Sequence, residues 1–515
     1  METIVDLLTS ASKYRPNKPI IIFGEDVYTY KYFDEETNRI ANSLKSLGIK
    51  NKDRIALFLP SKPIFCLCSL AIMKLGAIVA PFNYMFKEIE IERMLRVTNC
   101  RTIITTERGC KILSKIVNEL NTLKDVILVK TGEDNETDAN LDFIDFEELV
   151  RNKSTEFEKV YIDFDDVALL MHTSGTTGIP KCIMETHKNI VINGRNHVCM
   201  LKYTMDEEVI ICPLPIYNNY GFTIQFISAL TSIATFVMIE KWDTGKVYDS
   251  ILRYHGTRIG GTPTMYVYML RGYNKEIHNG IKLENCQVAG QKCTKEIIEQ
   301  FEETFKTRLI DSYGASETAW ATSNPASGIH KLGSAGTTIG NSKVFIVDND
   351  LNILPAKEIG EVIINNDSVA SGYWNNPEAT KQSFTTLGWR SGDLGYLDED
   401  GYLYIVDRKK DMIITGGANI YPADIEEVLY THPKISIASI VGIPDKEKGE
   451  IPVAYVICKE GKTATEEEII EFCRNKMAVY KAPRRVKFVN SIPLGPTGKI
   501  LKNELRSLAA KDLAK

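Results

Sequence analysis

The chain has 515 residues and a formal net charge of −5, with 44% hydrophobic and 25% charged residues. A single hydrophobic core stops growing well below this length, so at least two domains are expected. The balance is that of an ordinary globular protein, and the slight acidity argues against a general polyanion binder, so we expect no nucleic acid partner.

The cysteines and the apolar stretches indicate the cellular compartment of the protein. The eleven cysteines are scattered and show no zinc-ligand spacing, which favours free thiols in a reducing compartment. The N-terminus has no signal-peptide pattern. The most apolar stretch, 65–82, is interrupted by Lys74 and Gly76 and is too short for a convincing membrane span. We therefore expect a cytoplasmic protein without a membrane span, as a monomer or a homodimer.

The N-terminal part alternates strand-like and helical patterns. RIALFLP (54–60) predicts a buried strand, the segment from Pro63 to Gly76 has helical spacing, and AIVAPF (77–82) predicts the next strand. The runs ATFVMIE and SILRYHG, followed by TRIGGTP, repeat this order between residues 234 and 263. Strand–helix–strand units of this kind predict a parallel sheet.

The pattern changes twice further along the chain. From about Lys343, short alternating strands with Gly and Asp turns predict a small β-rich subdomain at about 343–407. After Arg408 an α+β pattern of about a hundred residues predicts a separate domain. The charged stretch 407–411 is either a hinge or an ordinary solvated turn. We thus expect an α/β fold, with an N-terminal domain (1–407) of stacked, mostly parallel sheets and helices, and a small mobile C-terminal domain (408–515).

One loop indicates phosphate chemistry. HTSGTTGIPKC (172–182) combines hydroxyls, two glycines and a lysine, and glycines let backbone N–H groups form an anion-binding concavity. It differs from the usual nucleoside-triphosphate loop, because Pro180 replaces the second glycine and Cys182 the magnesium-binding hydroxyl. A flexible turn is the alternative interpretation of such a cluster.

Three later segments supply complementary chemistry. DSYGASET (311–318) offers Tyr313 to stack on a purine and Glu317 to bind magnesium. Asp393 follows a glycine turn and could accept both ribose hydroxyls. Lys499 precedes a helix, where a positive charge opposes the helix dipole and therefore suits an anion. Taken singly, each segment also fits an ordinary turn or helix start.

Together, and in this order, these motifs resemble the adenylate-forming superfamily of acyl-coenzyme A (CoA) synthetases, peptide-synthetase adenylation domains and firefly luciferase. The similarity extends over nearly the whole chain. It implies that ATP, Mg²⁺, CoA and a small carboxylic acid are bound. It also implies an acid–thiol ligase, which forms an acyl-adenylate with release of pyrophosphate and then an acyl-CoA thioester with AMP as product.

The resemblance assigns roles to individual residues. It places Lys499, Glu317 and Thr177 in catalysis, with Glu317 and Thr177 holding the metal. It places the following residues at ATP or AMP: Thr173, Ser174, Gly175, Thr176, Thr177, Gly178, Lys181, Gly290, Gln291, Asp311, Ser312, Tyr313, Gly314, Ser316, Asp393 and Arg408. It places these residues in the acyl pocket: Tyr217, Asn218, Gly290 and Gly314. Lys410 falls at the hinge, and Gly416 and Gly417 face CoA.

Departures from the family pattern bear on the substrate. Cys182 stands where glycine is usual, and we expect it to be tolerated. Asn218 replaces a common histidine, while Gln291 and Lys292 are large and polar where small residues are usual and could alter the acyl pocket. These residues favour a short or polar acid over a very long fatty acid. The alternative function is a stand-alone enzyme that adenylates an acid or amino acid and loads a carrier-protein thiol.

Overall fold

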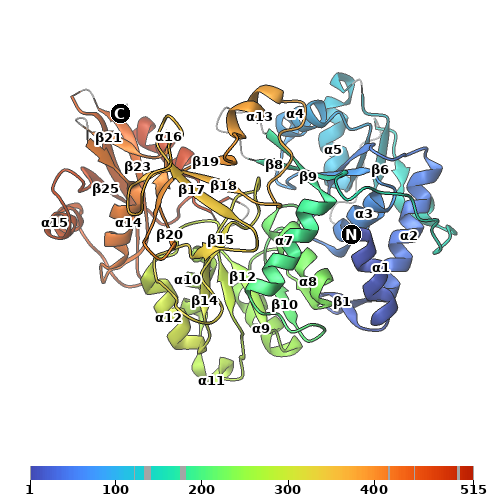
Figure 1. Cartoon of the computed structure of the whole chain (residues 1–515), viewed down its shortest axis with the longest axis horizontal. Coiled ribbons are helices and arrows are strands. Elements are labelled where there is room, and N and C mark those ends of the chain that lie inside the picture. The colour runs from blue at the N-terminus through green and yellow to red at the C-terminus, as the bar shows by residue number, and fades with distance from the viewer. Residues whose placement is uncertain are drawn as a thin grey trace.

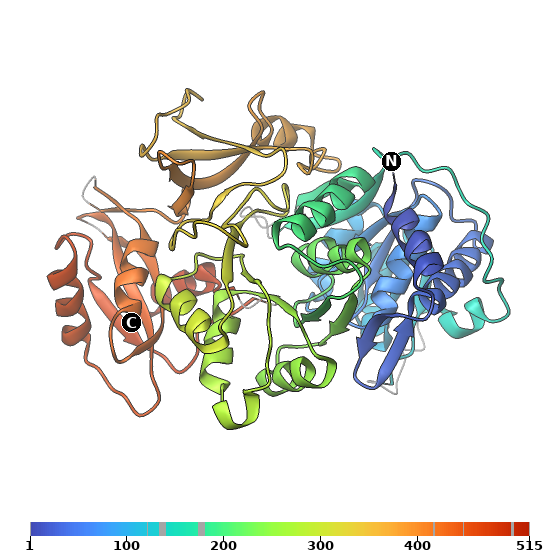
Figure 2. The same cartoon turned by 60° about the horizontal axis from the view of Figure 1, so that its bottom comes forward.

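The computed structural model describes residues 2–120, 122–132, 141–173, 181–415, 418–445, 447–495 and 499–513. Its four sheets lie side by side, with the C-terminal residues at one end of the molecule and the N-terminal residues at the other (Figures 1 and 2). The predicted α/β fold, with a large N-terminal part and a smaller C-terminal one, is confirmed. No helix in the described part of the chain is long and apolar enough to cross a membrane.

A seven-stranded sheet near the N-terminal end contains the first predicted strand–helix–strand unit. Its neighbouring strands run parallel except for the last pair, β8 and β9, which form an antiparallel hairpin. In spatial order the strands are β7 (Ile144–Asp145), β6 (Asp125–Leu128), β5 (Thr102–Thr105), β3 (Arg54–Phe58), β4 (Ile78–Pro81), β8 (Val167–Thr173) and β9 (Lys181–Thr186). The accompanying helices are α1 (Ile4–Tyr14), α2 (Tyr30–Ser46), α3 (Pro63–Lys74), α4 (Glu88–Thr98), α5 (Glu107–Ile116), the 3₁₀ turn η1 (Val117–Glu119) and α6 (Phe146–Val150).

Helix α3 shows why the most apolar stretch is not a membrane span. Pro63 starts the helix at a position where its missing N–H costs nothing, and the chain turns at Gly76 with a φ of +69°. Nearly every side chain of the helix is buried in the main hydrophobic core, because α3 packs on α1 and α2 as well as on the sheet. A helix that is apolar all round belongs inside a protein of this size.

A nine-stranded sheet forms the middle of the molecule. In spatial order its strands are β16 (Thr337–Thr338), β15 (Thr322–Ser323), β14 (Leu309–Tyr313), β13 (Cys286–Val288), β12 (Arg258–Gly261), β10 (Val209–Cys212), β11 (Thr235–Met238), β1 (Pro19–Phe23) and β2 (Asp26–Thr29). The connecting helices are α7 (His187–Met200), the π-helix η2 (Tyr220–Phe226), α8 (Ile227–Ser232), α9 (Thr244–Tyr254), α10 (Pro263–Gly272), α11 (Lys275–His278) and α12 (Lys295–Phe305). The six strands from β14 to β1 are parallel, so their carboxyl ends lie at one edge of the sheet, where ligands of such sheets bind.

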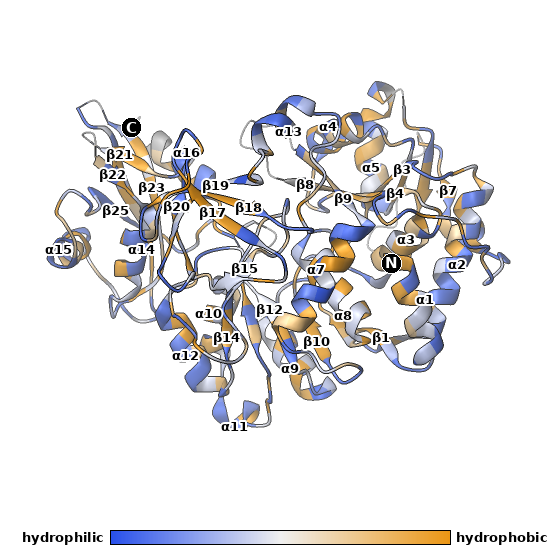
Figure 3. Cartoon of the chain, in the orientation of Figure 1, coloured by the Kyte–Doolittle hydropathy of each residue, from blue (hydrophilic) through white to orange (hydrophobic). Residues whose placement is uncertain are grey.

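Two smaller sheets complete the chain, and their strand pairs are antiparallel except for the parallel pair of β24 and β25. The first is a four-stranded sheet of β17 (Lys343–Val347), β18 (Gly360–Asn365), β19 (Trp389–Leu397) and β20 (Leu403–Arg408), with α13 (Pro377–Ser383). The second contains β21 (Ile413–Thr415), β22 (Ala418–Ile420), β23 (Ile435–Asp445), β24 (Gly449–Cys458) and β25 (Arg485–Phe488), with α14 (Pro422–Tyr430), α15 (Glu466–Lys476) and α16 (Lys502–Leu513). The hydrophobic colour in Figure 3 follows the strands, whereas α12 on the outside is mostly hydrophilic.

The cysteines fit the expectation of free thiols. All eleven are free; Cys199 is exposed, Cys458 is half-buried, and the others are buried. Cys182 packs in the core with side chains of α4 and α5, and burial raises the pKa of its thiol to about 12. Its side chain therefore fills a core position, which accounts for a cysteine in place of the usual glycine.

Candidate functional site

Three predicted nucleotide residues lie in mutual contact. Asp393 on β19 pairs with Arg408 across the β19–β20 ladder, and the Arg408 Nε lies 3.2 Å from the Asp393 Oδ1. The Tyr313 hydroxyl at the end of β14 donates to the Asp393 Oδ2 at 2.6 Å. Asp393 is only 6% exposed, and its charge raises the pKa of Arg408. The proposed ribose acceptor is thus held between a phenol and a guanidinium.

Glu317 lies in a second group, beside the strand that starts at Lys181. The Tyr373 hydroxyl donates to the Glu317 Oε1 at 2.9 Å, and the Lys181 ammonium lies 4.6 Å from the centre of the Tyr373 ring. Glu317 is buried, and burial raises the pKa of its carboxyl. The predicted phosphate lysine and the predicted metal carboxylate therefore meet at Tyr373, a residue that the sequence did not single out.

A second buried carboxylate, Glu185, lies near Glu317 and was also missed. It accepts hydrogen bonds from the Asn219 side-chain amide and, at 3.1 Å, from the Thr223 hydroxyl. Burial raises the pKa of Glu185 to about 8, and the charge of Glu317 adds to this. Asn219 also donates to the Ser316 carbonyl at 3.2 Å, which ties Glu185 to the segment that carries Glu317. The signal in the sequence was an acidic residue within the apolar strand KCIMET.

Lys499 reaches this edge of the nine-stranded sheet from the C-terminal part of the chain. Gly290 has a φ of +90°, and a Cβ there would lie 2.8 Å from the Lys499 Cε. Withdrawal from water among the surrounding protein atoms, and then the charge of Arg408, lower the pKa of Lys499 to about 8, while Asp393 opposes this. Taken as a whole, the residue is exposed.

Further contacts hold the C-terminal sheet against the N-terminal part. The Lys292 ammonium lies 3.1 Å from the Glu427 Oε2 on α14, and the Asp407 Oδ2 accepts a hydrogen bond from the Ala423 amide at 3.0 Å. The charge of Lys292 is therefore paired at the interface with α14, and the prediction that Lys292 alters the acyl pocket stays a prediction. Gln291 is half-buried beside it.

The remaining predicted nucleotide residues support β14 and the turn after it. Asp311 and Ser312 are buried, burial raises the pKa of Asp311 well above its usual range, and the Ser312 and Ser323 hydroxyls lie 2.9 Å apart. A Cβ on Gly314 would come within 1.6 Å of the Ala319 carbonyl oxygen, so the turn requires glycine.

The predicted acyl residues before η2 lie in different surroundings. Tyr217 is buried in the main core, where burial raises the pKa of its phenol to about 12. Asn218 is half-buried, and its carbonyl accepts a hydrogen bond from the Phe222 amide at 3.0 Å. Tyr220, one turn further on, lies closer to the reaction edge, since its hydroxyl donates to the Gln287 side chain at 3.1 Å on β13.

Part of the predicted site lies outside the described residues. This applies to Ser174, Gly175, Thr176, Thr177, Gly178, Gly416 and Gly417. Thr173 and Lys181, which flank the first group, are paired across the β8–β9 ladder. Lys410 is exposed in the turn between β20 and β21.

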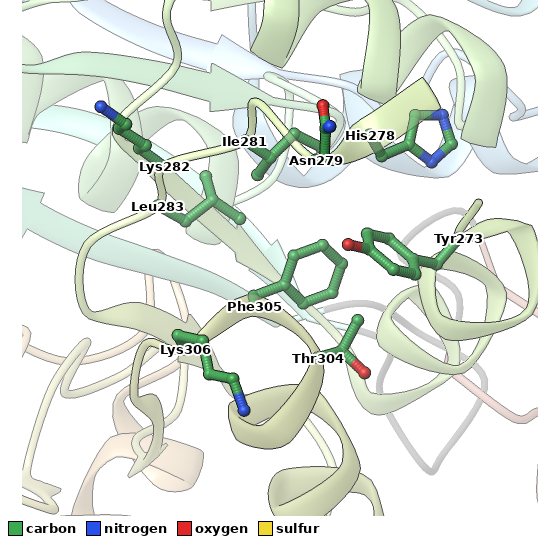
Figure 4. A pocket seen from close by; sticks show the side chains of 9 residues that line it. All are labelled: Tyr273, His278, Asn279, Ile281, Lys282, Leu283, Thr304, Phe305 and Lys306. Carbon is green, nitrogen blue, oxygen red and sulfur yellow. The ribbon is translucent and has the colours of Figure 1, made fainter. Parts of the chain in front are cut away.

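A cavity of about 320 Å³ lies away from these residues. Figure 4 shows it beside α11 and the end of α12, and none of the predicted site residues lines it. Its lining consists of Tyr273, His278, Asn279, Ile281, Lys282, Leu283, Thr304, Phe305 and Lys306. The candidate active site is therefore the edge where Lys499, Gly290, Asp393 and Glu317 are gathered.

The sequence matches two family models, one described as AMP-binding enzyme over residues 8–374 and one as AMP-binding enzyme C-terminal domain over residues 424–499. The chain belongs to the AMP-binding enzyme family. The predicted membership of the adenylate-forming superfamily is thereby confirmed.

Named members of this family cover nearly the whole chain. The long-chain-fatty-acid–CoA ligase of Bacillus subtilis (strain 168) is 30% identical, over 98% of this chain and 94% of its own length. The 4-coumarate–CoA ligase 2 of Petroselinum crispum is 32% identical, over 95% of this chain and 91% of its own length. The crystal structure of the anthranilate CoA ligase AuaEII in complex with anthranoyl-AMP has a TM-score of 0.92 at 26% identity, over 100% of this chain and 98% of that one. These relatives also confirm the prediction that the chain is an AMP-forming acid–thiol ligase.

Members of the family act on ATP, and the residues near Glu317 fit the magnesium ion that the resemblance implies. Magnesium prefers oxygen ligands, usually one or two carboxylates together with substrate phosphates. Glu317 and the nearby Glu185 are both buried carboxylates, and the Asn219 Oδ1 is buried without a hydrogen-bond partner. No group of three or more His, Cys, Asp or Glu residues in the described ranges could hold a metal without such phosphates.

Proposed function

We propose that the chain is an ATP-dependent carboxylic acid:CoA ligase. In its first step an oxygen of the acid's carboxylate bonds to the α-phosphorus of ATP, and the bond to the departing pyrophosphate breaks. In its second step the CoA thiol attacks the acyl carbon, and AMP leaves as the thioester forms.

The position of Lys499 carries this proposal. Its ammonium comes from the C-terminal part of the chain and lies against Gly290, within the electrostatic influence of both Asp393 and Arg408. An acid and the α-phosphate of ATP are both anions, so a positive charge between them offsets their repulsion. A preorganised charge of this kind is among the largest contributions to catalysis.

The nucleotide end supplies the remaining chemistry. Asp393 accepts the ribose hydroxyls once they displace the Tyr313 hydroxyl, and Lys181 and the adjoining segment 173–180 bind the departing phosphates. Glu317, with Thr177, would hold Mg²⁺, which would supply neutralisation of the phosphate charge. No general base is required, because the attacking carboxylate is already ionised.

For the second step, the C-terminal part of the chain rotates about a hinge at Lys410. The residue lies in the turn between the four-stranded sheet and the C-terminal sheet, where rotation of residues 408–515 would withdraw Lys499. Gly416 and Gly417 would then face the incoming thiol. Domain rotation between two half-reactions is a recognised form of catalytic gating.

The alternative is transfer of the acyl group to a carrier-protein thiol. Every relative described above is named a CoA ligase, which favours CoA. The pair Tyr217-Asn218, where an aspartate would hold the amino group of an amino acid, argues against an α-amino acid substrate.

The test is pyrophosphate release from ATP with a panel of carboxylic acids, with and without CoA and with a phosphopantetheinylated carrier protein. We expect acid-dependent release that CoA accelerates, together with an acyl-CoA product seen by mass spectrometry. Lys499→Ala should lower release about 100-fold or more, whereas Lys462→Ala, an exposed lysine in the same domain, should not. Release that is unaffected by Lys499→Ala, or thioester formed only on the carrier protein, would contradict the proposal.

A further inference from the structure

We infer that Tyr373 is a positioning residue of the adenylation step. Its hydroxyl orients the carboxylate of Glu317 toward the metal ion, and its ring holds the ammonium of Lys181 where the departing pyrophosphate is bound. The inference deepens the proposed acid:CoA ligase reaction and so rests on that proposal.

The hydrogen bond between Tyr373 and Glu317 has a fixed direction. Tyr373 is only 5% exposed, and its hydroxyl lies 2.9 Å from the Glu317 Oε1 and 3.5 Å from the Nε1 of the buried Trp389. An indole N–H can only donate, so the single hydrogen of the phenol is left for the carboxylate. Because one carboxylate oxygen is held in this way, rotation of the carboxylate is restricted and its other oxygen has a defined direction.

The backbone around Tyr373 joins the two segments that carry the charged groups. Residues 370–374 run along β9, with Tyr373 opposite Ile183 in an antiparallel bridge, and backbone hydrogen bonds of 2.7 to 3.0 Å join the two segments. At the start of this segment, the Ala370 amide donates to the Glu317 carbonyl at 2.8 Å. The segment therefore connects β9, the strand of the phosphate lysine, with the turn that carries the metal carboxylate.

The ring of Tyr373 holds the second charged group. The Lys181 ammonium lies 4.6 Å from the ring centre, within the range where a cation is attracted to the face of an aromatic ring. Phe384 packs edge-on against the same ring, with the centroids 5.7 Å apart. Tyr373 thus contacts two groups of opposite charge, a carboxylate through its hydroxyl and an ammonium through its ring.

These two contacts predict two separate losses when Tyr373 is changed. Carboxylates that ligate metals are themselves held by hydrogen bonds, and removal of such a partner typically costs about 10- to 100-fold in metal affinity. A cation–π contact at a partly exposed site contributes less, which corresponds to about fivefold in the affinity for an anion that the cation binds. A residue that only fills space would show neither loss.

The first measurement is Mn²⁺ binding in the presence of ATP, followed by electron paramagnetic resonance with Mn²⁺ as the probe for Mg²⁺. Tyr373→Phe removes the hydroxyl and keeps the ring, and we expect the Kd for Mn²⁺ to rise at least about tenfold. The Mg²⁺ concentration that gives half-maximal pyrophosphate release should rise in parallel. Tyr30→Phe is the matched control, because the Tyr30 hydroxyl is also buried but donates to the Ala229 and Ala234 carbonyls in the main core. It should leave both values unchanged.

The second measurement is pyrophosphate binding without metal, followed by calorimetry in the presence of a chelator. Tyr373→Leu removes the ring together with the hydroxyl, so the Kd for pyrophosphate should rise about fivefold. Tyr373→Phe keeps the ring and should bind pyrophosphate as the unaltered protein does. If Tyr373→Leu does not fold, Tyr373→Met, which also lacks a ring, replaces it.

The outcomes separate this inference from the proposed function. An unchanged Kd for Mn²⁺ in Tyr373→Phe would overturn the role of the hydroxyl. Pyrophosphate affinity that is unchanged without the ring, or that falls equally in Tyr373→Phe, would overturn the role of the ring. Neither binding measurement requires an acid or CoA, whereas failure of the proposed function would appear as the absence of pyrophosphate release with every acid.

Discussion

The two ends of the candidate site differ in how their polar groups are paired. At the nucleotide end, Asp393 is held by Tyr313 and Arg408, and Glu317 is held by Tyr373. At the proposed acyl end, beside Gly314, the Trp320 Nε1 is buried without a hydrogen-bond partner. A ligand at the nucleotide end would therefore replace hydrogen bonds that the protein already makes, whereas the Trp320 indole has none to replace.

This difference has a consequence for product release. Exchanging one partner for another changes little in net hydrogen bonding, so the nucleotide end can release its products readily.

After Lys499→Ala, the largest effect is expected at the nucleotide end, from Asp393→Ala. The substitution removes an acceptor for the ribose and leaves Arg408 without its partner. Hydrogen bonds to charged groups contribute about 1.5–3 kcal/mol each, so KM for ATP should rise roughly 10- to 100-fold. The measurement is the ATP dependence of pyrophosphate release.

Asp398→Ala is the matched control for this prediction. Asp398 lies in the same β-hairpin and pairs with Lys331, away from Tyr313. Its removal should leave KM for ATP unchanged. An Asp393→Ala protein with unaltered KM would show that the paired aspartate is only structural, and the contrast between the two ends would then fail.

The second effect concerns the hinge rather than either end. Lys410→Pro fixes φ at a turn residue, and we expect adenylation to stay within about twofold while thioester formation falls about tenfold, because rotation of the C-terminal part is hindered. Single-turnover assays of each half-reaction measure this split. Lys410→Ala, which keeps the backbone free, should behave as the unaltered protein does, and equal loss of both half-reactions in Lys410→Pro would remove the hinge role.

Much of the nucleotide end could be predicted from the sequence, because its chemistry is carried by short segments with distinctive residue types. Asp393, Arg408, Tyr313 and Lys499 are brought together by the fold as the motifs indicated. The hydrogen-bond acceptor of the Tyr313 hydroxyl could not be predicted, because its contact with Asp393 depends on how the four-stranded sheet packs against β14.

The acyl end could not be predicted in the same way. Buried polar atoms without a partner stand at isolated positions such as Gln225, Thr262 and Trp320, and no local sequence pattern marks them. Lys292 is an example, because the sequence does not show that its ammonium pairs with Glu427 on α14. The direction of a side chain depends on the tertiary structure, which a linear motif does not specify.

The next effect concerns stability rather than activity and is expected from Glu185, the buried carboxylate that the motifs missed. Glu185→Leu leaves the amide of Asn219 and the hydroxyl of Thr223 without an acceptor, so the free energy of unfolding should fall by about 2–4 kcal/mol. Glu185→Gln keeps an acceptor oxygen and should lose less. Denaturant unfolding of the two variants measures the difference, and equal stability would mean that the nucleotide end does not depend on this pairing.

The smallest effect concerns the pH dependence of Lys499, which links the two ends. Withdrawal from water and then the charge of Arg408 lower the pKa of Lys499 to about 8. The charged form is the one that offsets anion repulsion, so kcat/KM for ATP should be constant below this pH and fall as the pH rises through it. Arg408→Gln removes the neighbouring positive charge, so protonation of Lys499 becomes easier and the falling limb should move to higher pH, even though overall activity is lower. A falling limb that stays in place or moves to lower pH would mean that the charge of Arg408 does not lower the pKa of Lys499. Lys499 would then be coupled to the nucleotide end less strongly than its position beside Gly290 indicates.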